Sequence, residues 1–177
     1  MDKYQQELDN IEQLSEAVTP RSFFISSVDI FEASIEDLVQ RVFRKDDHAV
    51  KYAVEPLLNN SGPLGELDVR LKLLYALGII SQDIYQDIDK FIQLRNFLNQ
   101  EASEYHFTDS EIIEPIKTLH EVKNMGVVQL DIAPPADDAE LSFYRMQIAR
   151  QEQVVRSTLS LVVAAICRAL HADNPLL

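Results

Sequence analysis

Residues 66–73, with the sequence ELDVRLKL, decide the fold class of this chain. Polar and apolar side chains alternate strictly along them, a pattern typical of a β-strand. The composition favours a helix instead, because only Val69 is β-branched and most of the other residues are good helix formers. Two acid–base pairs also stand four residues apart in the order that stabilises a helix: Glu66 with Arg70, and Asp68 with Lys72.

This predicted helix ends at Gly78, since glycine readily adopts the left-handed conformation common at helix C-termini. Its leucine and valine residues lie on two sides: Leu67, Leu71 and Leu74 on one, and Val69, Leu73 and Leu77 on another. A helix that is apolar on much of its circumference is expected in the interior. We therefore predict that this helix is central.

Upstream, Thr19 and Pro20 suit the N-cap and the first position of another helix. Apolar residues then recur at spacings of three and four residues: Phe24, Val28, Phe31, Ile35, Leu38 and Val42. They predict a helix of about 24 residues with a continuous apolar seam, ending near residue 44. Asp46 can cap the next helix, in which Pro56 predicts a kink or an early end.

Downstream, Ser81 can cap a further helix, and residues 108–111 open another. Residues 126–139 contain two prolines and form the best loop candidate. The last predicted helix covers about residues 139–171. At 1.5 Å per residue it would be about 50 Å long, against roughly 40 Å for a compact globule of this size. We expect it to break or to project, and a projecting apolar helix favours a homodimer.

The composition agrees with a helical protein, because the 177 residues include only four glycines and no tryptophan. We predict an all-α fold: a single multi-helix, bundle-like domain of about six to seven helices with a long C-terminal helix. Residues 1–18 are expected to form a mobile acidic N-terminal arm, and residues 19–177 a single helical domain.

The net charge of −13 argues against a protein whose main task is to bind phosphate backbones. The start MDKYQQELDN is acidic where a secretory signal would be basic, and the longest apolar stretch, residues 161–167, is too short to span a bilayer. We therefore expect a cytoplasmic location. The single cysteine, Cys167, has apolar neighbours and is expected to be a buried, inert thiol.

Motifs of catalysis are missing from the sequence, which has no phosphate-binding loop, nucleophile elbow, HExxH or CxxC. Two carboxylate pairs occur at helical spacing, Glu32 with Glu36 and Asp83 with Asp87. Neither pair has a neighbouring group that would tune its acidity, so we interpret both as solvated helix faces. We predict no enzyme activity, no metal and no cofactor.

A helix-turn-helix could form from residues 66–77, the turn at 78–80 and the helix from Ser81. The helix that would enter the DNA groove begins with Asp83, Asp87 and Asp89, and carboxylates there would repel phosphate. The C-terminal helix offers the alternative DNA contacts. Within a dimer, Arg145, Arg150 and Arg156 could form a basic surface, although they lie on more than one helix face.

Four blocks of the sequence resemble the bacterial mannitol operon repressor family: VFRKDDHAVKYAVEPLL (42–58), SGPLGELDVRLKLLYALGIIS (61–81), EYHFTDSEI (104–112) and MQIARQEQVVRSTLSL (146–161). The second block is the most specific, and the similarity runs from about residue 21 to residue 161. The N-terminal arm and the PPADD loop depart from the family pattern. The resemblance implies a cytoplasmic negative regulator of mannitol uptake and catabolism genes, with an all-helical fold and no conventional DNA-binding module.

A repressor family and a poor DNA-binding sequence are reconciled if repression depends on protein contacts. We expect the partner to be a transcription factor or a component of the sugar phosphotransferase system, such as its phosphocarrier. Polar residues of the family-like blocks are the candidate partner-binding residues: Arg44, Asp46, Asp47, Lys51, Arg70 and Lys72. A structural role remains open for several, because Asp46 can cap a helix and Asp47 can pair with Lys51.

Overall fold

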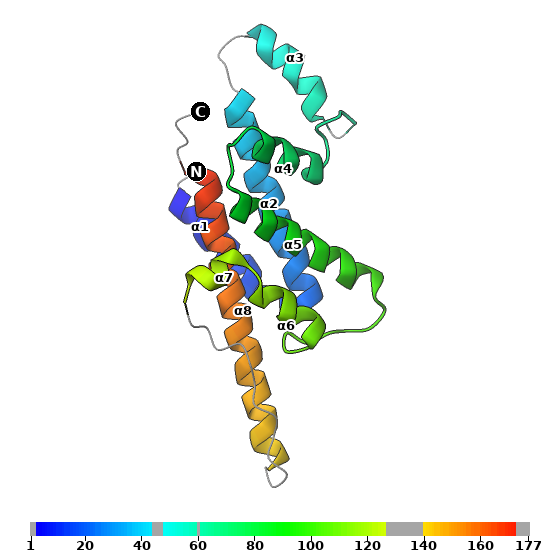
Figure 1. Ribbon diagram of the computed structural model, residues 1–177, viewed down its shortest axis with the longest axis vertical. Coiled ribbons are helices and arrows are strands. Elements are labelled where there is room, and N and C mark those ends of the chain that lie inside the picture. Colours follow the sequence, from blue (N-terminus) through cyan, green and yellow to red (C-terminus); the bar gives the residue numbers. More distant parts are fainter. Residues whose placement is uncertain (1–2, 44–47, 60, 127–139, 173–177) are drawn as a thin grey trace.

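The computed structural model describes residues 3–43, 48–59, 61–126 and 140–172, and the regular structure in these ranges is entirely helical. Figure 1 shows the helices in chain order: α1 (Lys3–Glu16), α2 (Pro20–Phe43), α3 (His48–Leu58), α4 (Leu67–Ala76), α5 (Gln82–Gln100), α6 (Ser110–Lys117), α7 (His120–Asn124) and α8 (Leu141–His171). The predicted all-α fold with a long C-terminal helix is confirmed. These eight described helices exceed the six to seven expected, because α1 and the five-residue α7 were not predicted as helices.

Helix α2 is the centre of the domain and packs against α1, α3, α4, α5 and α8. Its observed range matches the helix predicted from the apolar seam, and Thr19 begins it as expected, since its hydroxyl accepts a 3.2 Å hydrogen bond from the Ser22 N–H. The buried residues of α2 cover about half of its circumference. That is why one helix can contact neighbours on several sides.

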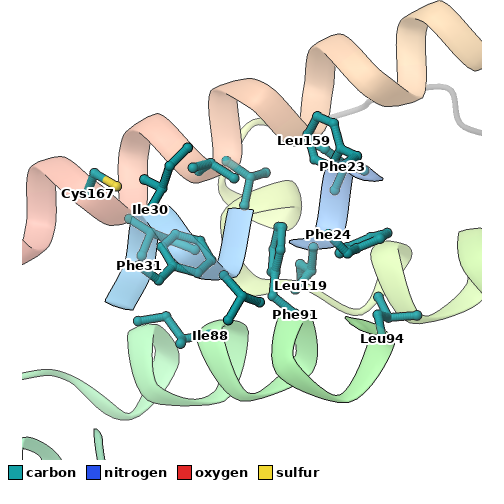
Figure 2. Packing of buried hydrophobic residues seen from close by; sticks show 14 of the residues in the cluster. Phe23, Phe24, Ile30, Phe31, Ile88, Phe91, Leu94, Leu119, Leu159 and Cys167 are labelled. Carbon is teal, nitrogen blue, oxygen red and sulfur yellow. The ribbon is translucent and has the colours of Figure 1, made fainter. Parts of the chain in front are cut away.

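Aromatic side chains form the middle of the core, where α2 lies between α8 and α5 (Figure 2). Phe91 of α5 contacts both Phe24 and Phe31 of α2, with ring centroids 5.3 and 5.2 Å apart. All three side chains are completely buried. Burial of each such side chain contributes about 1.5–3 kcal/mol, so this cluster is a major source of stability.

Helix α4 confirms the helical interpretation of the alternating stretch, but the prediction that it is central is wrong. Leu71 and Leu74 are fully buried, whereas Val69 and Leu77 are 37% and 48% exposed. The helix therefore buries only one side. It ends as predicted at Gly78, whose φ of +70° lets the N–H of Ile79 bond the carbonyl of Leu74 at 3.0 Å.

Gly62 makes the turn between α3 and α4 possible. A Cβ atom at this position would lie 2.6 Å from the carbonyl oxygen of Leu57 and would also overlap the carbonyl of Pro56. Both obstacles are backbone atoms, which cannot move aside cheaply. The chain after α3 therefore folds back tightly on the end of that helix, which continues two residues past Pro56.

Helix α8 is unbroken and projects from the bundle (Figure 1). Its first buried residue is Val155, so residues 141–154 extend beyond the helices that cover the rest of it. By length and composition alone, α8 is the one helix in the described ranges that could cross a bilayer. Half of this apolar stretch is buried inside the protein. A helix of a protein core can have the same length and apolar composition, so α8 is only weak evidence for a membrane span.

Helix α1 differs from the mobile arm that was expected at the N-terminus. Residues 3–16 form a helix that packs against α2 and α8. Leu14 is 1% exposed and Ala17 is 6% exposed, so this segment contributes to the core. Its few apolar residues made it look like an arm, yet Leu14 and Ala17 are enough to fasten its C-terminal end to the bundle, whereas Leu8 and Ile11 stay 43% and 40% exposed.

Candidate partner-binding surface

The predicted partner-binding residues divide into those the structure describes and those it does not. Arg44, Asp46 and Asp47 lie outside the described residues. Lys51 belongs to α3, but its side chain is outside the described part. Arg70 and Lys72, both in α4, can be examined directly.

Arg70 is a structural residue and is not available to a partner. Its guanidinium donates hydrogen bonds of 2.6 Å to the carbonyl of Leu64 and 2.8 Å to the carbonyl of Leu58. The residue is only 4% exposed. Arg70 therefore fastens the end of α3 and the following turn to α4, which corrects its assignment as a partner contact.

Lys72 lies on the opposite, solvent-facing side of α4. Its ammonium group donates a 2.6 Å hydrogen bond to Asp68, one helical turn earlier, and this bond raises the pKa of Lys72. The side chain of Lys72 is 60% exposed. It remains accessible to another molecule and stays a candidate partner contact.

Apolar side chains surround Lys72 on this side of the helix. We call the surface the α4 outer face and define it by Val69, Lys72, Leu73, Tyr75 and Leu77. Val69, Tyr75 and Leu77 are each between 37% and 48% exposed. Such a concentration of exposed apolar side chains on one helix is typical of an interaction surface.

One residue of the α4 outer face, Tyr75, stacks on a tyrosine of α5. The rings of Tyr75 in α4 and Tyr85 in α5 lie 4.8 Å apart at an interplanar angle of 19°. The pair joins two helices and holds both rings in place. Rigid aromatic side chains at the surface favour protein contacts, because little conformational entropy is lost when a partner binds.

Sequence reasoning missed this surface although its signal was present. Val69, Leu73 and Leu77 recur every four residues, and this pattern was interpreted as a second buried side of a central helix. The pattern shows that an apolar stripe exists. It does not show whether the stripe is covered by the same chain.

The helix-turn-helix candidate is disfavoured by the way α7 packs on the first turns of α5. The carboxylate of Asp87 is 1% exposed and accepts hydrogen bonds from the backbone N–H groups of His120 and Glu121 in α7. The His120 ring also lies 2.8 Å from Gln86. Since α7 packs against the Asp87 side of α5, that side of the helix is not available to a DNA groove.

The arginines proposed as alternative DNA contacts have unequal surroundings. Arg145 and Arg150 are exposed on the projecting part of α8. Arg156 donates a 3.3 Å hydrogen bond to the carbonyl of Ser15 at the end of α1. Arg156 thus has a structural partner, which leaves two exposed arginines on different faces of the helix.

No group of three metal-binding side chains occurs among the described residues. Cys167 is buried as expected and accepts a 3.7 Å hydrogen bond from the Ser34 hydroxyl. Burial raises the pKa of its thiol to about 11. The carboxylate pair Asp83 and Asp87 is not a solvated face, since Asp87 is buried and anchors α7.

The fold and this surface define an all-α protein with an exposed apolar helix face. Residues 6–171 match the family model described as "Mannitol repressor". The chain belongs to the mannitol repressor family. The resemblance stated from the sequence blocks is thereby confirmed.

Known relatives agree with this assignment. The chain is 48% identical over 151 residues to the mannitol operon repressor of Escherichia coli K12, a match that covers 85% of this chain and 75% of that protein. The E. coli repressor chain in the X-ray structure of the MtlR-HPr complex superposes with a TM-score of 0.86 at 43% identity, covering 95% of this chain and 99% of that one. A protein named Fumarase E from E. coli K12 is 30% identical over 163 residues, covering 92% of this chain and 95% of that protein.

Proposed function

We propose that this chain is a cytoplasmic negative regulator of mannitol uptake and catabolism genes that acts through protein contacts and catalyses no reaction. The partner is the HPr component of the phosphotransferase system, and it docks on the α4 outer face. The observation that carries the proposal is the similarity to an E. coli protein whose structure was solved in complex with HPr.

The α4 outer face supports the location of the contact. Three of its side chains, Val69, Tyr75 and Leu77, are apolar and well exposed, and Lys72 stands among them with its charge at the surface. The net charge of −13 favours a partner with a basic patch, because complementary charge speeds and orients association. Apolar anchors inside a polar surround are typical of protein interfaces.

A calorimetric titration of HPr into the purified protein tests the proposal. We expect saturable binding, and we expect Leu77→Asp to weaken it at least about tenfold, because a carboxylate would replace the most exposed of the three apolar contacts of the interface. Leu161→Asp is the matched control. Leu161 is 57% exposed, against 48% for Leu77, but belongs to α8.

A reporter under the mannitol promoter tests the same variants in cells. We expect Leu77→Asp to relieve repression while Leu161→Asp retains it. No binding of HPr by the wild-type protein would refute the partner. Equal weakening by both variants would refute the docking surface, and circular dichroism would verify that both variants are folded.

Direct DNA binding through a dimer is the second candidate, because Arg145 and Arg150 are exposed on the projecting part of α8. A titration of the promoter fragment at about 50 and 200 mM salt separates the two candidates, since phosphate contacts give a steep dependence on salt. We expect no promoter-selective binding by the protein alone. Selective, salt-sensitive binding that Arg145→Ala and Arg150→Ala abolish would favour the DNA-binding candidate.

A further inference from the structure

A pocket of about 330 Å³ lies between α1 and α8, away from the α4 outer face. The two helices are in contact, and Figure 1 shows α1 behind the C-terminal part of α8. The floor of the pocket is apolar and consists of Leu14, Val163, Ala164 and Cys167, each at most 8% exposed. The volume is within the range of small-molecule sites, which begins at about 300 Å³.

Two side-chain amides form the α1 side of the pocket. Gln6 and Asn10 are one helical turn apart, and both line the cavity. Among the residues that the structure describes, neither amide has a hydrogen-bond partner. Each amide can both donate and accept, so together they offer matched positions to a ligand with several hydroxyl groups.

An ion pair joins the two walls of the same pocket. The guanidinium of Arg168 in α8 lies 3.2 Å from the carboxylate of Glu7 in α1, and both residues line the cavity. The two charges cancel. His171 also lines the pocket, and its ring Nδ1 lies 2.7 Å from the carbonyl oxygen of Cys167. The Glu7–Arg168 pair therefore adds no net positive charge that would attract an anion, and the whole chain carries a net charge of −13.

We propose that this pocket binds a small, uncharged, polyhydroxylated molecule of the sugar-alcohol class. Hydroxyl groups would meet the amides of Gln6 and Asn10, and the carbon chain would lie on the floor of Leu14, Val163 and Ala164. A phosphate or a dicarboxylate would need a cation that is not already paired. The role of such a molecule as a regulatory ligand rests on the proposed function, whereas its binding does not.

Amide-resolved NMR of the ¹⁵N-labelled full chain, with mannitol as the probe, tests the site without HPr or DNA. At up to about 50 mM mannitol we expect saturable shifts in residues 6–14 and 160–172. Mannitol 1-phosphate and fumarate serve as anionic comparators. Fumarate is included because one relative is named a fumarase.

Two variants locate the contact. Asn10→Ala should weaken mannitol binding at least about fivefold, because it removes one hydrogen-bonding amide. Gln13→Ala is the control, since Gln13 is an exposed amide on the same helix that does not line the pocket, and it should change the affinity less than twofold.

Three results of the mannitol titrations would each overturn the inference: no shifts with mannitol, shifts outside the two helices, or an unchanged affinity in Asn10→Ala. Tighter binding of either anion at the same residues would also refute an uncharged ligand. If mannitol does not bind at these residues while HPr still binds, the ligand pocket alone is refuted. Loss of HPr binding with intact mannitol shifts would refute only the proposed function.

Discussion

The carboxylate of Asp87 accepts a 2.8 Å hydrogen bond from the backbone N–H of His120, 33 residues further along the chain. Its second oxygen accepts a 2.9 Å hydrogen bond from the N–H of Glu121. One buried side chain of α5 thus satisfies two backbone donors at the start of α7. The short helix is held in place by this contact as well as by its own packing.

Replacing Asp87 tests that anchor. We expect Asp87→Asn to lower the free energy of unfolding by about 1–3 kcal/mol, because one carboxylate acceptor becomes an amide donor that faces a backbone N–H. Urea denaturation measures the change. Asp83→Asn is the control, since the side chain of Asp83 is 63% exposed, and it should cost less than about 0.5 kcal/mol.

Arg70 and Lys72 give a second comparison, between a buried and an exposed base two residues apart. Arg70→Met leaves the carbonyls of Leu58 and Leu64 without their donors, so we expect a loss of about 2–4 kcal/mol in unfolding free energy. Lys72→Met removes only a surface pair, worth less than about 1 kcal/mol. Equal losses in chemical denaturation would contradict the structural role of Arg70.

The thiol of Cys167 gives a prediction for pH. Burial raises its pKa from 9.0 to about 11, so the protonated thiol is the form favoured in the folded protein. Since the thiolate is the reactive form, alkylation of the native protein should continue to accelerate as the pH rises from 9 to 11. In urea, where the thiol has its ordinary pKa of 9.0, the rate should be half-maximal near pH 9 and level off above about pH 10. Coincident pH profiles in the two states would contradict the prediction.

The projecting part of α8 gives a prediction about assembly. Leu141, Phe143 and Met146 are between 52% and 63% exposed there, and we expect a second copy of the chain to cover them. Light scattering should give about twice the chain mass of 20.2 kDa. The double variant Phe143→Ser, Met146→Ser should halve that mass, whereas Val18→Ser should not. A monomeric wild-type protein would refute the homodimer.

Much of the fold could be predicted from local patterns. Apolar spacing located α2 within about one residue of its observed ends, and composition overruled the strand-like alternation of residues 66–73. Gly78 marked the end of α4 because its conformation there is one that other residues avoid. These features are determined by residues that are close together in the chain, so they can be predicted from one sequence.

The candidate surfaces were less predictable because they depend on contacts between distant residues. Nothing near Arg70 in the sequence indicates that it binds the carbonyls of Leu58 and Leu64, and nothing near Asp87 indicates the anchor for α7. The exposed side of α4 and the packing of α1 against the bundle were mispredicted for the same reason, because both depend on contacts between distant residues. Periodicity reveals an apolar stripe but not the element that covers it.

The meeting of α1 with α8 has a consequence for how the protein folds during synthesis. Glu7 pairs with Arg168, 161 residues later, and Arg156 bonds the carbonyl of Ser15 across 141 residues. The side of α2 that faces α8 must likewise wait for α8 to leave the ribosome. We therefore expect a nascent intermediate of α2 to α7 with an uncovered apolar side, which a chaperone can bind until the last helix arrives.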